Sequence, residues 1–424
     1  MKGHAPHPAW RALWRFSGPV VYALAKLGAT FDTKLDLAIT GRINEKWSDI
    51  PQNAIVFHCA SVGEFEAARP VIERMQERGH KVVVTVGSPS LYNRKTTATN
   101  KRFPWYWAPI DLHREVKRFL DSAKPRAIVI TKHDIWPEIV WQARERGVPT
   151  LLQSGNYRTD SKRNLVFARS FQRSLLGALS GIGAIAKEDA ERFVQLIGKR
   201  TEIRVTGDTR YDRVLTAAAR PDPRDPALIK WCEELPTIVL GSGWEPDELL
   251  LFEALQEFRE AGMQFRLIAV PHESDEEHLN GAEYRLTNCG FHPVRYSNGL
   301  SKLEKADSLL VDVQGVLASL YRGATVAWVG GGFGAGVHSV LEPAVFGTPL
   351  LYGPNITMSR EARLFAENGG GVVVDREDSG WRDKLRFWLI DPIARNDSAA
   401  ASKRIISEEA GATDRVCSWI EALL

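Results

Sequence analysis

The strongest chemical signal in the sequence is a glycine-rich segment, Trp328–Pro354, which reads WVGGGFGAGVHSVLEPAVFGTPLLYGP. A strand is expected to end at Val329, and five glycines follow within the seven residues 330–336, before a helix expected to begin near His338. Glycine lets a backbone approach a ligand closely, and the free N–H groups at a helix N-terminus bind phosphate. Glu342 would stand one turn into the helix, where its carboxylate could reach a ribose hydroxyl. The segment therefore predicts a nucleotide site.

The same segment admits a second interpretation, because Gly330, Gly332 and Ala335 fit the G-x-G-x-x-[GA] fingerprint of dinucleotide-binding proteins. That fingerprint belongs after the first strand of its domain and needs an acid at the end of the next strand. Here the segment comes late in the chain, and the next strand candidate, TPLLYGP, contains no acid. An NAD- or FAD-binding protein is therefore the weaker alternative.

A second segment, His58–Pro70, places an acid at the start of a helix and reads HCASVGEFEAARP. A strand ends there, Ser61 lies in the turn, and Glu64 follows in the first helical turn. A carboxylate in this place can simply favour the helix dipole, which contributes about 0.3–1 kcal/mol. Glu66 could serve that purpose as well, which would leave Glu64 free. A general base is the functional alternative for Glu64 at this point.

Two further segments put charges where strands are expected to end. Ile130–Glu138 reads ITKHDIWPE, with Lys132 and Asp134 directly after an apolar run. Val205–Val214 reads VTGDTRYDRV, in which Arg210 could meet an anionic leaving group because its guanidinium matches phosphate oxygens. The alternatives are a solvated loop and a surface cluster of ion pairs, respectively.

The sequence does not predict a metal site, a disulfide framework or a nucleic-acid partner. His272 follows a strand candidate beside Pro271 and is interpreted as a polar binding residue, since no second histidine or acid stands at convincing ligand spacing. Asp312 is a single acid in a strand candidate. The four cysteines are far apart and form no C-x-x-C pair, which fits a reducing compartment. A net charge of +3 is too small to indicate nucleic acid.

The elements that must position these residues alternate between short apolar strands and amphipathic helices, which predicts parallel sheets covered on both faces. A Pro-rich, charged stretch, RPDPRD at residues 220–225, divides two halves of similar pattern. We expect two doubly wound α/β domains with ligands beyond the carboxyl ends of the strands. The strand candidates are residues 54–59, 81–86, 127–131, 150–153, 182–186 and 202–205 in the first half, and 237–240, 265–270, 293–296, 308–313, 325–329, 349–352 and 371–374 in the second.

The N-terminal stretch Trp10–Phe31 is apolar but too short and interrupted to be a conventional spanning helix. Basic residues flank its uncharged part. Trp10 directly precedes Arg11, and Trp14 directly precedes Arg15. We expect a helix that lies at a membrane surface, held by these aromatic and basic anchors. A secretory signal and a terminal helix packed on the first domain are the alternatives.

Three of these motifs together resemble those of the Kdo transferases, the 3-deoxy-D-manno-octulosonic acid transferases of lipopolysaccharide assembly. They are SVGE after the first strand, GDTRYDRV at the domain junction and VGGGFGAGVHSVLEPAVFGTPLLYGP near the end, and the resemblance runs from about residue 10 to residue 420. It implies a GT-B fold, in which two Rossmann-like domains face a cleft, and an inverting transfer without a tightly bound metal or other cofactor. The implied parts are an anchor segment (1–50), an acceptor-binding domain (51–218) and a CMP-sugar-binding domain (219–424) whose last helix could pack back on the first.

The resemblance also implies roles for single residues. Glu64 matches the family's catalytic base. Asp134 stands where the family has an acid before the tryptophan, usually Glu, and Arg210 stands at a basic position assigned to transition-state stabilisation. The residues that match the family's donor-binding positions are Pro271, His272, Gln314, Gly315, Val316, Ser339, Val340, Leu341 and Glu342.

We therefore predict an enzyme that moves Kdo from CMP-Kdo to a lipid A precursor at the cytoplasmic face of the inner membrane. One alternative is another GT-B transferase that uses a UDP- or GDP-sugar, which competition by CMP but not by UDP would exclude. The other is an inactive homologue that binds a nucleotide or a lipid, which the presence of Glu64, Arg210 and Glu342 disfavours.

Overall fold

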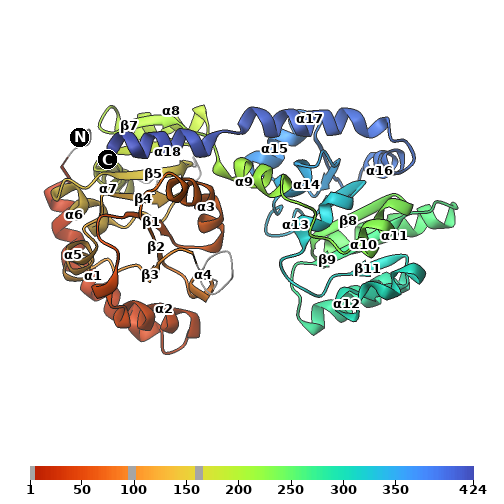
Figure 1. The fold of residues 1–424 in the computed structure, drawn as a ribbon, viewed down its shortest axis with the longest axis horizontal. Helices are drawn as coiled ribbons and strands as arrows, with labels where there is room; N and C mark the ends of the chain where they lie inside the picture. The colour runs from red at the N-terminus through yellow and green to blue at the C-terminus, as the bar shows by residue number, and fades with distance from the viewer. Residues whose placement is uncertain (1–4, 94–101, 158–165) are drawn as a thin grey trace. The chain divides into compact units, whose positions relative to one another are not determined.

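A computed structural model describes residues 5–93, 102–157 and 166–424 of the chain. Contacts divide the chain into two compact units: unit 1 is Met1–Arg213 with Ala410–Leu424, and unit 2 is Val214–Glu409. The division falls inside helix α9 (Thr209–Ala218), at whose end the sequence placed the domain boundary. The last helix belongs to unit 1 (Figure 1).

Unit 1 is built on a seven-stranded sheet whose order in the described residues is β3-β2-β1-β4-β5-β6-β7. All neighbours pair in parallel. The chain leaves β1 toward one edge of the sheet and returns beside it with β4, so the switch point of the topology lies between these two strands. The strands are β1 (Ile55–Cys59), β2 (Val82–Val86), β3 (Trp105–Trp107), β4 (Ala127–Thr131), β5 (Thr150–Gly155), β6 (Gly181–Ala184) and β7 (Glu202–Val205).

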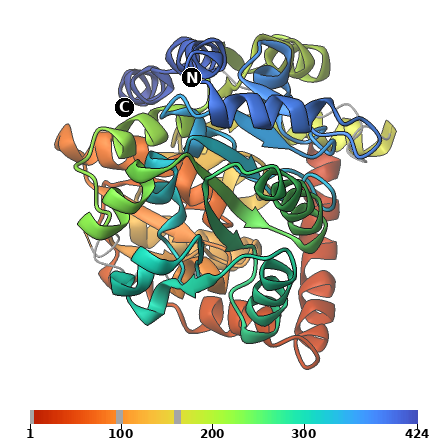
Figure 2. The same ribbon diagram turned by 90° about the vertical axis from the view of Figure 1, so that its right-hand side faces the viewer.

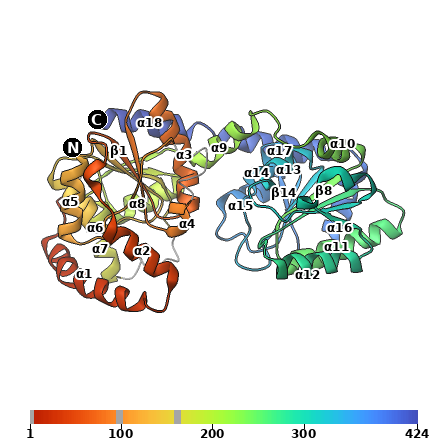
Figure 3. The ribbon, with the colours of Figure 1, turned by 60° about the horizontal axis from the view of Figure 1, so that its bottom comes forward.

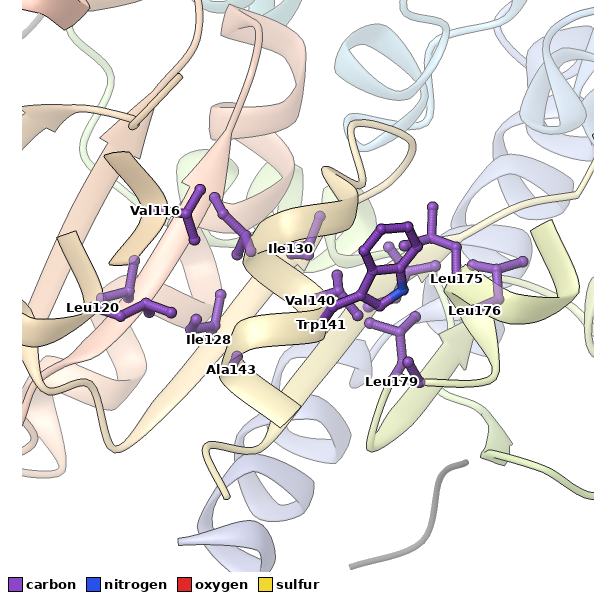
Figure 4. Packing of buried hydrophobic residues seen from close by; sticks show 14 of the residues in the cluster. Val116, Leu120, Ile128, Ile130, Val140, Trp141, Ala143, Leu175, Leu176 and Leu179 are labelled. Carbon is purple, nitrogen blue, oxygen red and sulfur yellow. The ribbon is translucent and has the colours of Figure 1, made fainter. Parts of the chain in front are cut away.

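Helices cover both faces of this sheet. The core on one face joins the sheet to α5, α6, α7 and α8, and Figure 4 shows Trp141 of α6 among the leucines at positions 175, 176 and 179. The core on the other face joins it to α3 and α18, which pack together. The helices of unit 1 besides α9 are α1 (Pro8–Gly28), α2 (Thr33–Asn44), α3 (Val62–Glu77), α4 (Pro89–Tyr92), α5 (His113–Ala123), α6 (Pro137–Glu145), α7 (Val166–Leu176), α8 (Lys187–Ile197) and α18 (Ala412–Leu423).

Unit 2 has a second parallel sheet of seven strands, in the order β10-β11-β9-β8-β12-β13-β14. Its switch point lies between β8 and β12. Figure 2, in which unit 2 faces the viewer, shows this sheet between layers of helices. The strands are β8 (Thr237–Gly243), β9 (Arg266–Pro271), β10 (Pro293–Arg295), β11 (Ser308–Leu310), β12 (Val326–Val329), β13 (Leu350–Tyr352) and β14 (Gly371–Val373).

One face of the second sheet packs on α11, α12 and α16 through a core that contains Trp328, Trp381 and Trp388. On the other face, α14 packs against α17. The helices of unit 2 are α10 (Pro226–Glu234), α11 (Glu245–Glu260), α12 (Glu276–Asn288), α13 (Leu317–Leu320), α14 (Leu341–Ala344), α15 (Arg360–Glu367), α16 (Gly380–Ile390) and α17 (Ala394–Glu409).

The predicted α/β class and the two doubly wound sheets are confirmed, and every strand candidate corresponds to a strand. The sequence missed β3, a three-residue strand at the edge of the first sheet. Pro104 precedes it and Pro109 follows it closely, and proline is tolerated in such a position only because an edge strand has one unpaired side.

The N-terminal helices α1 and α2 lie at the periphery of unit 1 (Figure 3). We expected tryptophan and arginine side chains of α1 to be membrane anchors, and this is wrong. Trp14 Nε1 donates to Asp111 (2.9 Å), Trp10 Nε1 donates to Ser170 (3.1 Å), and Arg15 pairs with Glu138 (2.7 Å). These side chains instead fasten the helix to the domain, because the domain offers acceptors and a buried carboxylate at matching positions.

The opposite face of α1 is apolar and exposed. Its side chains are each more than half exposed: Leu13, Phe16, Val20, Leu24 and Leu27. Within the described residues, no helix combines the length and the apolar character that crossing a membrane requires.

Candidate active site

The two acids predicted for unit 1 follow neighbouring strands at the switch point. Glu64 lies in the first turn of α3, directly after β1, and Asp134 lies in the loop after β4. Since β1 and β4 are adjacent and parallel, both acids come to the carboxyl edge of the sheet. This is the place where open α/β sheets bind ligands.

Glu64 is a largely buried carboxylate, with 9% of its surface exposed. Its Oε2 accepts the backbone N–H of Ala60 at 2.7 Å, and its own N–H donates to Ser61 Oγ at 3.3 Å. Among the described residues, Oε1 has no hydrogen-bond partner. Burial raises the pKa of Glu64, the charge of Asp134 adds to this, and the Ala60 hydrogen bond opposes it. A carboxyl group with a raised pKa is suited to accept a proton near neutral pH.

The expectation that Glu66 would serve the helix start and leave Glu64 free is wrong. Glu66 instead forms ion pairs with Arg69 (2.7 Å) and Arg213 (3.0 Å). Glu64 is the residue that binds the Ala60 N–H at the start of the helix. Because this contact uses one oxygen only, Glu64 can hold the turn and still offer its other oxygen to a substrate.

Asp134 is held by two neighbours. Its Oδ2 accepts the indole N–H of Trp136 at 2.8 Å and lies 3.4 Å from Nε2 of His58 on β1. Burial alone would raise the pKa of Asp134, but the contacts with His58 and Trp136 and the charge of Arg42 outweigh it, and the pKa is lowered. Asp134 is therefore an ionised carboxylate that acts electrostatically on Glu64.

Arg210 lies at the start of α9 and is bound by Asp208, which is 1% exposed. Its Nε and Nη2 donate to Oδ2 of Asp208 at 2.9 and 2.7 Å. Burial would raise the pKa of Asp208, but Arg210 and then Lys132 lower it. Lys132 also acts on Glu64. The charge of Lys132 thus acts to lower the pKa of both Asp208 and Glu64, while Arg210 is paired with Asp208.

In unit 2 the glycine-rich segment follows β12, as expected, but the helix after it does not begin near His338. It begins at Leu341 and is only four residues long. The N–H of Val337 donates to Asn355 O and that of His338 to Gly330 O, both at 3.1 Å. These two amides are therefore already used, and the phosphate site predicted at the helix N-terminus near His338 is not formed by them.

The glycines of this segment let three loops pack backbone to backbone. A Cβ atom on Gly332 would lie 2.6 Å from the backbone nitrogen of Gly353, after β13. One on Gly330 would overlap the carbonyl of Ser242, near the end of β8. A Cβ on Gly334 would meet nothing closer than 3.9 Å. Most of the glycine pattern is thus explained by the close approach of loops.

The residues predicted to bind the donor lie at the end of β9 or in the segments that follow β9, β11 and β12, at the carboxyl edge of the second sheet. Val340 and Leu341 are buried in the core, so they could contact a nucleotide only through their backbone. Gly315 has a φ of +87° with open space around it. Of the other predicted residues, Pro271 ends β9, Val316 precedes α13, and His272 and Ser339 are exposed. Gln314 donates a hydrogen bond to Ser274 Oγ at 3.2 Å. Burial raises the pKa of the Tyr321 hydroxyl, and the charge of Glu342 raises it further.

Three residues at this edge were missed. Asp247 is fully buried and accepts hydrogen bonds from the indole of Trp328 (3.1 Å) and the N–H groups of Gly331 (2.9 Å) and Trp244 (3.2 Å). Burial raises its pKa, and these bonds oppose the rise. Trp244 and His338 contact each other beside it. Asp247 lies in the first turn of α11, three residues after Trp244, which directly follows β8. An acid in that position is the signal that could have revealed it.

Among the described residues, one group of side chains has the geometry of a cation site, namely Glu273, Asp275 and His278. All three are exposed. His278 contacts Asp275 at 2.7 Å and Glu273 at 3.0 Å. These ion pairs account for the cluster without a cation.

Comparison with known proteins gives one consistent family. Residues 38–213 match the family model described as 3-deoxy-D-manno-octulosonic-acid transferase (kdotransferase). The 3-deoxy-D-manno-octulosonic acid transferase of Bordetella pertussis is 26% identical over 385 residues, which cover 86% of each chain. That of Aquifex aeolicus is 27% identical over 331 residues, which cover 77% of this chain and 83% of the relative.

The fold agrees with known structures. A glycosyltransferase from Rickettsia africae superposes with a TM-score of 0.59 at 11% identity, over 88% of this chain and 98% of that one. Likeness at this identity concerns the fold alone. With the two doubly wound sheets, it confirms the GT-B type that the motifs implied.

Proposed function

Because this chain is similar to 3-deoxy-D-manno-octulosonic acid (Kdo) transferases over most of its length, we propose that it belongs to their family and is an inverting glycosyltransferase that moves Kdo from CMP-Kdo to a lipid A precursor. The observation that carries the proposal is Glu64. It is a largely buried carboxylate with a raised pKa, it lies at the switch point of the first sheet, and one of its oxygens is available.

Glu64 acts as the general base in this reaction. It takes the proton of the acceptor hydroxyl while that oxygen attacks the anomeric carbon of Kdo. The new C–O bond forms as the bond from the anomeric carbon to the phosphate oxygen of CMP breaks, and the electron pair leaves with CMP. Attack from the face opposite the leaving group inverts the anomeric carbon.

Unit 2 supplies the donor site in this proposal. Ser339 and the backbone around Gly315 bind CMP, and Glu342 holds its ribose. Arg210, oriented by Asp208, stabilises the charge that develops on the phosphate. We expect this chemistry to need no tightly bound metal, so transfer should persist in a chelator.

The exposed apolar face of α1 supports a peripheral position on the cytoplasmic face of the inner membrane. Phe16 is 82% exposed and Leu24 is 63% exposed, and both lie on the same side of the helix. Burying such side chains in the interfacial region of a bilayer is favourable. The acceptor is a lipid, so a membrane-bound enzyme would meet it where it resides.

A transfer assay tests the function. Purified protein is mixed with freshly generated CMP-Kdo and a tetraacylated lipid A precursor, and the lipid product is weighed by mass spectrometry. Addition of one or more Kdo units by the wild type, lost in Glu64→Ala and retained in Glu66→Ala, supports the proposal. A sugar added to the lipid only when UDP- or GDP-sugars are supplied would identify a different GT-B transferase. No increment with any donor, although nucleotide binds, would identify an inactive homologue.

A further inference from the structure

Three aromatic rings meet at the carboxyl edge of the second sheet. Trp244 follows β8, His272 follows β9, and His338 lies in the loop after β12. The centroid of the His272 ring is 4.4 Å from that of Trp244 and 4.5 Å from that of His338, at interplanar angles of 21° and 28°. Since Trp244 Nε1 also lies 3.3 Å from His338 Nε2, His272 cannot be sandwiched between the other two. Trp244 and His338 therefore touch edge to edge, and His272 stacks over both.

The edge contact fixes the tautomer of His338. An indole nitrogen only donates a hydrogen bond, so Nε2 of His338 must accept it and carry no proton. The proton of the neutral ring is then on Nδ1. Burial lowers the pKa of His338, and the proximity of His272 lowers it further, which favours this neutral form. His338 is thus a neutral ring with one N–H of defined direction.

The ring cluster stands where a ligand is expected. β8 and β12 flank the switch point of the second sheet, and each contributes one of the two hydrogen-bonded rings. Asp247 binds the N–H groups of both Trp244 and Gly331, so the tryptophan and the glycine-rich turn are held by one buried carboxylate. His338 directly precedes Ser339, the first residue of the segment assigned to the donor.

We propose that Trp244 is a positioning residue that holds His338 as its Nδ1–H tautomer, so that His338 donates this hydrogen bond to an oxygen of the bound cytidine nucleotide. His272 covers the pair and keeps water from the shared hydrogen bond. The proposal rests on the proposed function, because it assumes that unit 2 binds CMP.

Matched substitutions of His338 test which nitrogen is used. The amide nitrogen of asparagine can take the place of Nδ1, whereas that of glutamine reaches the place of Nε2. His338→Asn should bind CMP within about threefold of the wild type, and His338→Gln should bind roughly tenfold more weakly, the effect of losing one hydrogen bond to a charged group. Calorimetric titration with CMP measures both, and thermal melting checks that the variants are folded.

The tautomer is read directly by nitrogen NMR of the histidine rings. In the wild type, His338 should show a protonated Nδ1, and its signal should move when CMP binds. Trp244→Phe keeps an aromatic ring but removes the donor, so this signature should be lost and CMP affinity should fall by roughly tenfold.

The outcomes separate the two levels of the argument. Equal affinity of both His338 variants, or a wild-type ring protonated on Nε2, would overturn the assignment of Trp244 and His338 while CMP binding stands. A wild-type protein that binds no CMP would overturn the proposed donor and this inference with it.

Discussion

His58 Nε2 lies 3.4 Å from Oδ2 of Asp134, across the two strands that flank the switch point of unit 1. His58 is 3% exposed, and its other ring nitrogen lies 3.2 Å from Thr85 Oγ1 on β2, so its ring is fixed from both sides. This contact holds the Asp134 side chain in one position. Because the charge of Asp134 raises the pKa of Glu64, the His58 contact sets the environment of the proposed base.

Asp134→Asn should move the acid limb of the pH–rate profile. The base works only when it is deprotonated, so kcat/KM falls as the pH drops through the pKa of Glu64. The ionised Asp134 raises that pKa. Removing its charge should therefore lower the pKa, so that activity extends to lower pH, while the weaker base makes kcat smaller by about tenfold or more.

Transfer rates measured between pH 4 and 8 check this shift. Asp121→Asn is the control, since Asp121 is an acid of α5 that pairs with Lys117 and Arg146 away from Glu64. An acid limb that stays in place in Asp134→Asn would show that Asp134 does not act on the base.

Arg210→Gln should destabilise the protein as well as slow the transfer reaction. The substitution leaves Asp208 buried without its ion-pair partner. The expected loss is about 1–3 kcal/mol of unfolding free energy at pH 7. In the wild type, the lowered pKa of Asp208 contributes stability that is present above the unfolded pKa and lost as the pH falls through the folded value. In the variant, burial raises the pKa of Asp208. The difference in unfolding free energy between the variant and the wild type should therefore shrink as the pH falls. Urea unfolding at pH 7 and pH 4 measures it.

A double variant separates the structural and catalytic parts of Arg210. Asp208→Asn with Arg210→Gln removes both charges of the pair and should recover much of the lost stability. If turnover remains low in this stable protein, Arg210 acts in catalysis. Recovery of full turnover would assign it to structure alone.

The sequence could predict which residues follow a strand, but not the contacts that depend on the order of the strands in the sheet. Glu64 and Asp134 could be found because each directly follows an apolar strand, and parallel strands end at one edge. The His58 contact could not, since the neighbours of β1 follow from the packing of the whole sheet. The stacking of His272 on Trp244 and His338 was missed for the same reason, because the three rings follow three different strands.

The helix expected near His338 shows a different limit. Its residues favour a helix by pattern, but the N–H of His338 bonds back to Gly330 O and that of Val337 to Asn355 O. These tertiary bonds hold the segment in an irregular turn up to Leu341, where the helix begins. Local pattern predicted the element, and longer-range backbone pairing decided where it starts.

Gly332→Ala should destabilise unit 2 and weaken CMP binding, whereas Gly334→Ala should do neither. A Cβ on Gly332 would lie 2.6 Å from Gly353 N and 2.7 Å from its Cα, and backbone atoms cannot yield as a flexible side chain can. Forcing such contacts apart typically costs about 1–3 kcal/mol. The same methyl on Gly334 would meet nothing closer than 3.9 Å. Thermal melting with and without CMP compares the two variants, and equal melting temperatures would contradict the packing explanation.

Replacing Phe16 and Leu24 together by serine should release the protein from membranes without unfolding it. Both side chains lie on the exposed apolar face of α1, so their loss removes apolar surface available to a bilayer but little of the core. Burial of one such side chain contributes about 1.5–3 kcal/mol, so each should weaken vesicle binding by about tenfold or more. Leu249→Ser is the control, because Leu249 is 53% exposed on α11 of unit 2. Co-sedimentation with anionic vesicles measures binding, and unchanged partition of the double variant would remove α1 as the membrane contact.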